Sequence, residues 1–202
     1  MAKQVDAGAE RADTLLVHAC CGPCLAGSVA ALRAEAPRLA VFWENPNIHP
    51  FVEYQQRYVS LVRTANAFDL PLARGDDAYG LNRFLTALAG AYDQPARCRI
   101  CYRLRLEATA ARARQRGDAG FTTTLFISPY QHHDMLHEVG ELAGAAAGVR
   151  FVPIDLRPNF ARSRQSAKSM GLYRQQYCGC MFSEYDRYRN DARFRLPSGE
   201  ST

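Results

Sequence analysis

The chain has 202 residues, 48% of them hydrophobic, and a formal net charge of +5. This length suits one domain with a buried core, and no apolar run approaches the roughly 20 residues that a membrane span needs, so we expect no membrane partner. Residues 1–12 lack the apolar stretch of a secretory signal and are predicted to be a mobile lead-in to a single domain over 13–195, followed by a tail over 196–202.

The first half of the chain alternates apolar runs with helical patterns. Residues 13–19 and 39–43 are predicted to be buried strands, and 70–73 a short one. The segment from Pro23 to residue 36 is predicted to be helical, because proline is tolerated in a first turn and alanines follow. A loop with two prolines covers 44–50, and a second helix is expected over 51–68.

The second half continues the alternation. A loop around 76–79 leads to a helix near 81–88, and a long helix over 97–117 ends at a glycine. Strands are predicted over 121–128 and 150–156, and helices over 134–148, over 161–170 and beyond 182. Three histidines, His132, His133 and His137, are expected to lie at a surface helix N-terminus.

This alternation of strands and helices predicts an α/β fold, a single domain with a mostly parallel sheet flanked by helices. Ligands of open α/β sheets bind beyond the carboxyl ends of the strands. Cys20 and Cys21 follow the first predicted strand, and the segment 45–49 follows the second. We therefore expect these residues to face the same crevice.

All seven cysteines fall in three tight groups, whereas buried core cysteines would be scattered singly. The groups are Cys20, Cys21 and Cys24; Cys98 and Cys101; Cys178 and Cys180. Without a secretory signal, such a set favours metal binding or catalysis in the reducing cytoplasm over structural disulfides. The Cys-Gly-Pro-Cys box alone would suit a thioredoxin-like dithiol oxidoreductase, but this interpretation leaves five cysteines unexplained.

A metal site explains more of the sulfurs. Cys98 and Cys101 are three residues apart on a predicted helix, so both project from one face. With Cys20 and Cys21 they provide four thiolates, which suit zinc or an iron–sulfur cluster. The adjacent pair is unusual for one tetrahedral zinc ion and favours a cluster.

Cys178 and Cys180 flank a single glycine. A disulfide between them would close a short, strained loop, and strained disulfides tend to be labile or catalytic. The alternative is that both cysteines are further metal ligands.

Five motifs in chain order resemble one family, the cobalamin-independent QueH-type epoxyqueuosine reductases: HACCGPC, NPNIHP, RCRICYRLRLEATA, FTTTLFISPY and GLYRQQYCGC. The resemblance implies reduction of epoxyqueuosine to queuosine at the wobble position of tRNA anticodons, the last step of queuosine biosynthesis. It also implies a fold similar to the nucleotide α-hydrolase (PP-loop-like) fold. The PP-loop itself is absent from the sequence, so ATP use is not expected.

The resemblance further implies a [4Fe–4S] cluster, no cobalamin, and an external low-potential electron donor. The cluster ligands would be Cys20, Cys21, Cys98 and Cys101, and Cys178 and Cys180 would be the redox-active pair. Cys24 belongs to the family pattern, either as a ligand of an additional metal near the cluster or as a buried thiol. The sequence departs from the pattern after Tyr130, where Gln131-His132-His133 replaces a common lysine.

The remaining candidates have structural alternatives. His49 is placed to donate a proton in the crevice or to order its loop, and Asn45 and Asn47 are placed to bind substrate or to form the turn. Aromatic and basic residues beside the Cys-Gly-Cys pair would stack on and neutralise a tRNA loop, or pack in the core; these are Tyr173, Arg174 and Tyr177.

Four arginines flank the cysteines of the long helix, and some of them are expected to contact phosphate: Arg97, Arg99, Arg103 and Arg105. Two rival functions remain at this stage. A zinc-stabilised RNA-binding module would be colourless and would leave RNA unchanged, and a cluster-containing tRNA thiolase would need an ATP-binding loop.

Overall fold

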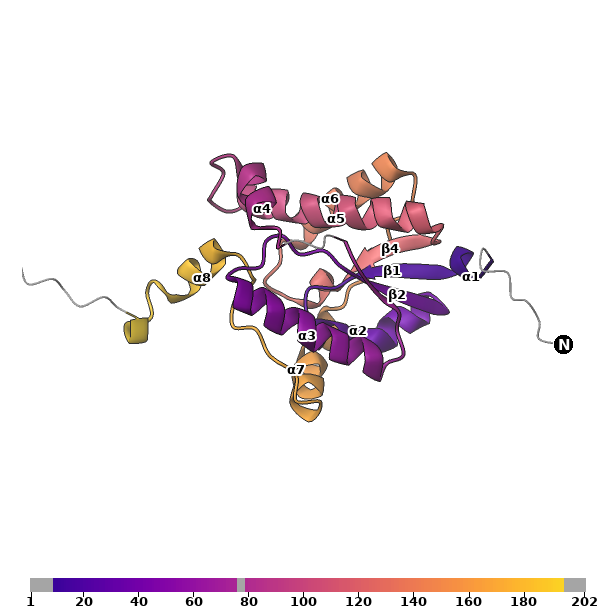
Figure 1. Cartoon of the computed structure of the whole chain (residues 1–202), viewed down its shortest axis with the longest axis horizontal. Coiled ribbons are helices and arrows are strands. Elements are labelled where there is room, and N and C mark those ends of the chain that lie inside the picture. The colour runs from indigo at the N-terminus through magenta and orange to yellow at the C-terminus, as the bar shows by residue number, and fades with distance from the viewer. Residues whose placement is uncertain (1–8, 76–78, 195–202) are drawn as a thin grey trace, which may run out of the picture.

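The computed structural model describes residues 9–75 and 79–194, with side chains from residue 11 onward. At its centre lies a parallel sheet with the strand order β3-β2-β1-β4 (Figure 1). The strands are β1 (Thr14–His18), β2 (Arg38–Trp43), β3 (Leu72–Arg74) and β4 (Gly120–Thr123). Leu16 of β1 pairs with Ala40 on one side and Phe121 on the other. The predicted α/β class and mostly parallel sheet are confirmed, and the arrangement is consistent with a PP-loop-like fold.

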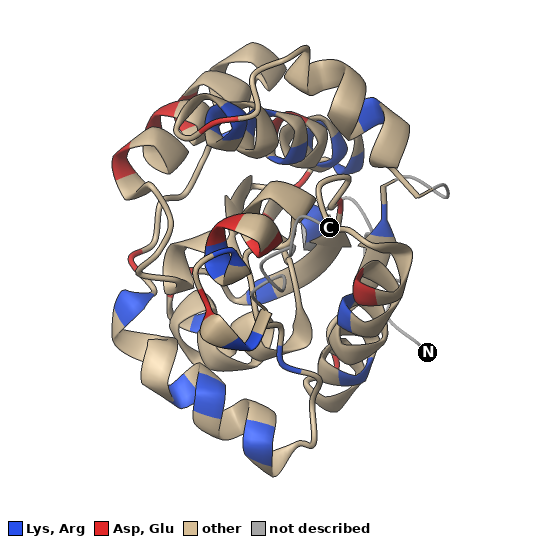
Figure 2. Ribbon diagram, turned by 90° about the vertical axis from the view of Figure 1, so that its left-hand side faces the viewer, with Lys and Arg blue, Asp and Glu red and all other residues tan. Residues whose placement is uncertain are grey.

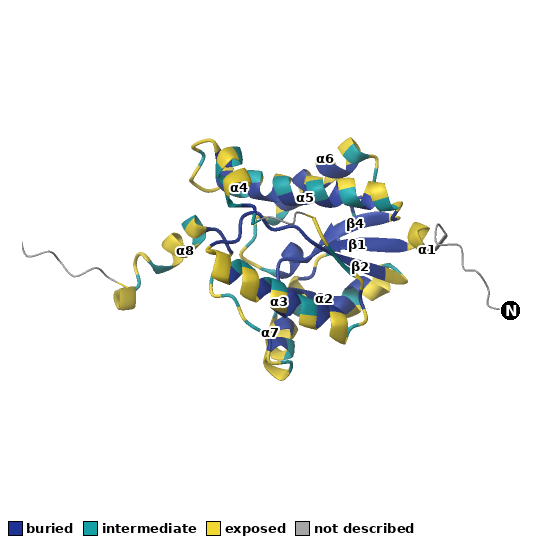
Figure 3. Ribbon diagram, viewed as in Figure 1, coloured by how far each residue is buried: buried dark blue, intermediate teal, exposed yellow. Residues whose placement is uncertain are grey.

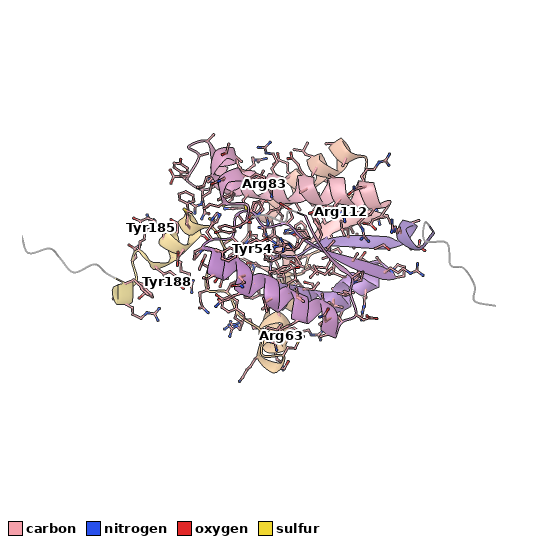
Figure 4. The ribbon with its side chains drawn as sticks, in the orientation of Figure 1. Tyr54, Arg63, Arg83, Arg112, Tyr185 and Tyr188 are labelled. Atoms are coloured by element: carbon pink, nitrogen blue, oxygen red, sulfur yellow. The ribbon has the colours of Figure 1, made fainter. Side chains whose placement is uncertain are left out.

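Helices cover both faces of this sheet (Figure 1). On one face α2 (Gly22–Glu35) packs against α3 (Phe51–Ala67) and α7 (Phe160–Ser169). On the other face α5 (Ala96–Arg116) packs against α6 (His133–Ala147), with α4 (Leu81–Leu88) beside the start of α5. Near the carboxyl ends of the strands α8 (Met181–Tyr188) stands away from the sheet, and its Tyr185 and Tyr188 are labelled in Figure 4.

The core has one layer on each side of the sheet, because successive strand residues point to opposite faces. Leu16 and Phe121 pack with Leu106 of α5, whereas Val17 packs with Leu61 of α3 in the second layer. All five are fully buried, and Figure 3 shows β1, β2 and β4 mostly in dark blue between helices whose outer faces are exposed. The strands are therefore held rigidly, and their carboxyl ends form a fixed platform.

Two predicted strands differ from the structure. The segment 150–156 is not a strand: only Phe151 bridges to Phe121, through two backbone hydrogen bonds to β4, and Pro153 has no N–H to continue the ladder. The predicted strand over 121–128 ends at Thr123 and turns into a 3-10 helix, η1 (Thr124–Ile127). The Thr123 hydroxyl accepts the Leu125 N–H and so caps this turn.

The ends of the chain are described only in part. Within the predicted lead-in, α1 (Ala9–Ala12) forms a single helical turn, and residues 1–8 lie outside the described residues. The predicted tail also lies outside them, as do residues 76–78 of the predicted loop. In the part of the chain that the structure describes, every helix is too short or too polar to cross a bilayer.

Candidate metal and redox site

Three cysteine sulfurs meet where the central strand ends. Cys20 and Cys21 follow β1, Cys21 is the residue just before α2, and Cys24 lies in the first turn of that helix. The three sulfur atoms lie within 4.8 Å of one another, and all three residues are buried. We call Cys20, Cys21 and Cys24 the three-sulfur group. Soft thiolate ligands at this spacing suit zinc or iron.

A close approach of two helices fixes the start of α2, the helix that carries Cys24 in its first turn. A side chain at Gly22 would place its Cβ 2.5 Å from the Ser60 carbonyl oxygen of α3. Only glycine therefore lets α2 begin so near α3.

Electrostatics favour one thiolate in the three-sulfur group. Hydrogen bonds from Cys21 and Cys24 lower the pKa of Cys20 well below its usual value. Burial raises the pKa of Cys21 to about 12, and the neighbouring Cys20 sulfur raises that of Cys24. The remaining protons are therefore held by the other two sulfurs, and a bound cation would displace them.

The other four cysteines form a second sulfur group, defined as Cys98, Cys101, Cys178 and Cys180. Cys101 and Cys180 pack in one buried cluster with Phe84 of α4. Cys178 is exposed, and the Gln131 amide donates to its sulfur at 3.6 Å. Burial raises the pKa of Cys98 to about 11 and of Cys101 to about 12, and Cys178 reinforces both shifts. The helical pair thus faces the Cys-Gly-Cys segment.

Arg105 connects the two groups. Its guanidinium donates to the Cys101 sulfur at 3.7 Å, to Asn45 Oδ1 at 2.7 Å and to His18 Nε2 at 3.3 Å. The side chain is 1% exposed. Its charge adds to the lowering of the pKa of Cys20 and opposes the larger rise that burial causes in the pKa of Cys101. The sequence predicts phosphate contacts for some of the flanking arginines and does not predict this role for Arg105. The available signal was the four-residue spacing from Cys101, which places both residues on one helix face.

The other flanking arginines differ from one another. Arg97 is buried and forms an ion pair with Asp186 of α8, whereas Arg99 forms an exposed ion pair with Glu138. Arg103 is exposed. The histidines lie where the sequence predicted, with α6 beginning at His133.

Arg57 is a second buried arginine that sequence analysis missed. It donates from Nη1 to the Cys178 carbonyl at 2.9 Å and from Nη2 to the Tyr177 carbonyl at 3.0 Å. Its Nε donates to Glu53 at 2.6 Å, and the Tyr173 hydroxyl donates to the same carboxylate. This network anchors the backbone of the Cys-Gly-Cys segment to α3.

The predicted substrate residues Tyr173 and Tyr177 belong to the same network. The Tyr177 hydroxyl donates to the His49 carbonyl, and the Tyr177 ring lies 5.5 Å from the Arg57 guanidinium. Both tyrosines are half-buried, whereas Arg174 is exposed. Their hydroxyls therefore order the segment, and their predicted role in stacking stays a prediction.

The loop after β2 lies beside the segment that follows β1, as predicted. Asn45 donates to the Ala19 carbonyl at 2.9 Å, and the His49 N–H donates to the Gly179 carbonyl at 2.8 Å. The His49 ring lies between Tyr79 and Phe84, and burial lowers its pKa to about 4. Asn47 Oδ1 is buried without a hydrogen-bond partner among the described residues. Both ring nitrogens of His49 are likewise buried without a hydrogen-bond partner among the described residues, so the loop supplies packing and three unsatisfied polar atoms.

Comparison with known proteins gives a consistent match. The family model described as "Epoxyqueuosine reductase QueH" matches residues 15–186. A protein of that name from Dehalococcoides mccartyi is 38% identical, covering 88% of this chain and 96% of its own. Its namesake from Thermotoga maritima is 33% identical, covering 92% of this chain and 98% of its own. The matched region includes both sulfur groups.

Proposed function

The chain belongs to the QueH family of epoxyqueuosine reductases, and from that premise we propose that it reduces epoxyqueuosine to queuosine at the wobble position of tRNA anticodons. The observation that carries the proposal is the three-sulfur group, buried at the carboxyl end of the central strand in a chain that matches the family over residues 15–186. Opening the epoxide to an alkene removes its oxygen as water and consumes two electrons and two protons. The protein is accordingly an oxidoreductase.

The cysteines fit a metal centre. Three buried sulfurs within 4.8 Å of one another, one with a lowered pKa, are the donor set that soft metals prefer. We propose Cys20, Cys21, Cys98 and Cys101 as ligands of a [4Fe–4S] cluster and Cys24 as a ligand of an additional metal ion. When bound, such a cluster supplies electrons one at a time at low potential.

In this proposal the Cys178–Cys180 pair is a two-electron donor. Oxidation of the two thiols to a disulfide releases two electrons and two protons, which balances one epoxide reduction. The exposed Cys178 is accessible to an external low-potential donor that restores the dithiol, and the buried Cys180 faces inward. Gln131 and Arg57 hold this pair in place through its sulfur and its carbonyl.

The loop after β2 and the tail segment would hold the substrate. We propose that Asn45 and Asn47 hydrogen-bond the modified base and that Tyr173, Arg174 and Tyr177 contact the tRNA loop. A pKa of about 4 keeps His49 neutral near pH 7. In this form the ring carries one N–H, so His49 would hydrogen-bond the epoxide oxygen and relay a proton to it.

Two rival functions are weaker. A thioredoxin-like nucleophile needs a lowered thiol pKa at the helix N-terminus, whereas burial raises the pKa of Cys21 to about 12. A zinc-stabilised RNA-binding module is compatible with the three-sulfur group, and metal analysis separates it from the reductase.

The deciding experiment combines metal analysis with an activity assay. Protein purified without oxygen is assayed for iron, acid-labile sulfide and zinc, and then mixed with dithionite and tRNA that carries epoxyqueuosine. About four irons and four sulfides per chain, with formation of queuosine, support the proposal. Zinc without sulfide and unchanged tRNA would refute it.

Variants of the cysteines assign the roles. Cys24 is proposed to bind the additional metal ion. Cys24→Ser is therefore expected to lose the iron that exceeds the sulfide content, while the sulfide content per chain stays the same. The double variant Cys178→Ser/Cys180→Ser is expected to keep the cluster and to lose multiple turnovers. Intact turnover in this variant would show that the pair is not redox-active.

A further inference from the structure

A cationic surface lies beside the candidate site and takes no part in the chemistry described above. Between Asp155 and Glu184 the sequence has no acidic residue. In this stretch α7 exposes three cations, which we call the α7 basic face: Arg162, Arg164 and Lys168. Among the described residues no carboxylate forms an ion pair with any of the three. Figure 2 shows the corresponding blue segments along the helix at the lower edge, without red.

The basic face has a fixed position relative to the cysteines. The opposite side of α7 packs on α2, the helix that begins at the three-sulfur group. Contact is so close that a Cβ on Gly27 would lie 2.5 Å from the Ser163 Cβ. At the end of α7, Arg63 of α3, labelled in Figure 4, donates to the Met170 and Gly171 carbonyls. The helix is therefore held at both ends.

The chain runs from the end of α7 at Ser169 to Cys178 along a segment fixed by two contacts. Leu172 packs against Ala167 of α7 and Ala26 of α2. The Gln175 amide then donates to the Cys24 sulfur at 3.8 Å, and Cys178 follows. A ligand held on the basic face would thus be bound by the helix that leads into the segment carrying Cys178 and Cys180.

An exposed aromatic ring adjoins the same surface. Tyr130 is 82% exposed, and its ring meets Phe160, the first residue of α7, edge to face at 6.1 Å. The next residue, Gln131, donates to the Cys178 sulfur. Tyr130 therefore lies between the start of α7 and Cys178. A large aromatic side chain this exposed gains little from the protein's own packing.

Cations that follow a sugar–phosphate backbone, together with aromatic rings on which bases stack, are the usual means of binding single-stranded RNA. We propose that the α7 basic face binds backbone phosphates of the tRNA anticodon loop and that a loop base stacks on Tyr130. This inference rests on the proposed function. It adds the surface that brings the wobble nucleotide to the sulfurs.

Charge reversal tests the phosphate contacts. Arg164 and Lys168 are one helical turn apart on the same side of α7, so the variant Arg164→Glu/Lys168→Glu removes two neighbouring contacts. The matched control is Arg114→Glu/Arg150→Glu, which changes the net charge equally. Its two exposed residues lie at the amino-terminal edge of the sheet, at the end of α5 and beside Gly120 of β4.

The first readout is binding of a fluorescently labelled tRNA transcript over a range of salt concentrations. The α7 variant is expected to raise Kd at least tenfold and to reduce the slope of log Kd against log salt by about 1.5, since two phosphate contacts are lost. The control is expected to stay within about twofold of the unmodified protein. Equal losses in both variants would show that only net charge matters, and this would overturn the proposal.

Tyr130 is tested by replacing the ring. Tyr130→Ala is expected to weaken transcript binding about tenfold, as removal of one stacking partner does, whereas Tyr130→Phe keeps a π face and binds normally. A loss in both variants would assign the contact to the hydroxyl, and unchanged binding in both would remove Tyr130 from the surface. Either result would overturn that part of the proposal.

An activity readout separates the surface from the chemistry. With tRNA that carries epoxyqueuosine, the α7 variant is expected to raise KM at least tenfold and to leave kcat unchanged. Normal KM would refute the surface while the proposed function stands. Failure of the unmodified protein to form queuosine would refute the proposed function, and transcript binding would still decide whether α7 contacts RNA. The unmodified protein could also bind the transcript weakly, with the same Kd in the α7 variant. This result would refute the RNA-binding surface and would make an acidic protein the partner of the α7 basic face.

Discussion

Arg57 holds the Cys-Gly-Cys segment from inside the protein. Two of its N–H groups donate to the carbonyls of Tyr177 and Cys178, and its charge is balanced by Glu53. The side chain is 1% exposed, so water cannot replace these bonds when they are lost. A segment whose sulfurs react must keep its backbone in place, and this arginine is the residue that does so.

We expect Arg57→Gln to loosen the segment from residue 172 to 180. Amide hydrogen exchange there should become faster, and the free energy of unfolding should fall by about 3 kcal/mol or more, because Glu53 is left buried and unpaired. Arg63→Gln is the control. That arginine lies on the same helix and also donates to carbonyls, at 3.3 and 3.4 Å, but it is exposed. Equal effects of the two variants would contradict the proposed anchor.

Arg105 orders the region between the two sulfur groups. The guanidinium donates in three directions, to Cys101, Asn45 and His18. A lysine keeps the charge but cannot reproduce this planar fork. The geometry therefore makes Arg105 a positioning residue for both sulfur groups.

Replacing Arg105 should affect stability and metal content together. Arg105→Gln is expected to lower the free energy of unfolding of the metal-free protein by about 3 kcal/mol, because it leaves buried acceptors unpaired. Arg105→Lys should cause a smaller loss, and both variants should bind less iron per chain. Arg103→Gln, exposed on the same helix, should change stability by less than about 0.5 kcal/mol. Normal iron content in both Arg105 variants would rule out a positioning role.

At the scale of elements, hydrophobic runs predicted β1, β2 and β3, and Gly117 correctly marked the end of α5. The prediction of a strand over 150–156 was wrong because the apolar residues of this segment pack in the core without forming a continuous strand ladder. Phe151 packs on Phe121 and Phe126 of the first core layer. Side-chain burial and strand pairing give the same sequence pattern. Only the position of Pro153 signals the difference.

The site was predictable at the level of motifs and less so at the level of contacts. Strand order and the α/β rule correctly placed the segments of Cys20 and Asn45 side by side at the carboxyl ends of the strands. The sequence could not show that Cys98 and Cys101 lie toward Cys178, because that depends on how α5 packs across the sheet. Buried arginines are equally hidden, since arginine is usually exposed and no local pattern distinguishes Arg57 from Arg63.

The contact between α2 and α7 gives an element-scale prediction. Alanine at Gly27 would gain helix propensity, but its Cβ would meet the Ser163 backbone and side chain at under 3 Å. We expect Gly27→Ala to lower the free energy of unfolding by about 1–3 kcal/mol, through forced separation of the helices. Urea denaturation measures this. Ala30→Gly, at an exposed position of the same helix, should lose only about 1 kcal/mol; a stabilised Gly27→Ala would show that α7 can shift freely.

At the scale of the whole molecule, the cysteines and several basic side chains lie at the same end of the parallel sheet. The carboxyl ends of β1 and β2 lead into the cysteines and the asparagine loop, and α7 and the segment after it bring cations to the same end. The segment from Leu172 to Cys180 packs over Cys24 and Arg57, which lie in the first third of the chain. Folding of the whole chain is therefore needed to complete the site.

Burial of His18 couples this folding to pH. The ring lies at the end of β1, fully buried, with Nδ1 at 2.8 Å from the Thr123 hydroxyl and Nε2 at 3.2 Å from the Glu44 carbonyl. Burial, with a smaller contribution from Arg105, lowers its pKa from 6.5 to about 3. Between these values the unfolded chain binds a proton that the folded protein does not bind. Stability from this residue is thus complete above pH 6.5 and is lost as the pH falls toward 3.

We therefore expect the free energy of unfolding to rise with pH in this window, with His18 contributing a slope of up to about 1.4 kcal/mol per pH unit. Urea denaturation of His18→Gln should show a slope flatter by that amount over the whole window. His49 has a pKa lowered only to about 4, so His49→Gln should flatten the curve only above that pH. Identical slopes for His18→Gln and the unmodified protein would contradict this prediction. They would mean that the ring accepts a proton in the folded protein, although it is buried and lies beside the Arg105 guanidinium.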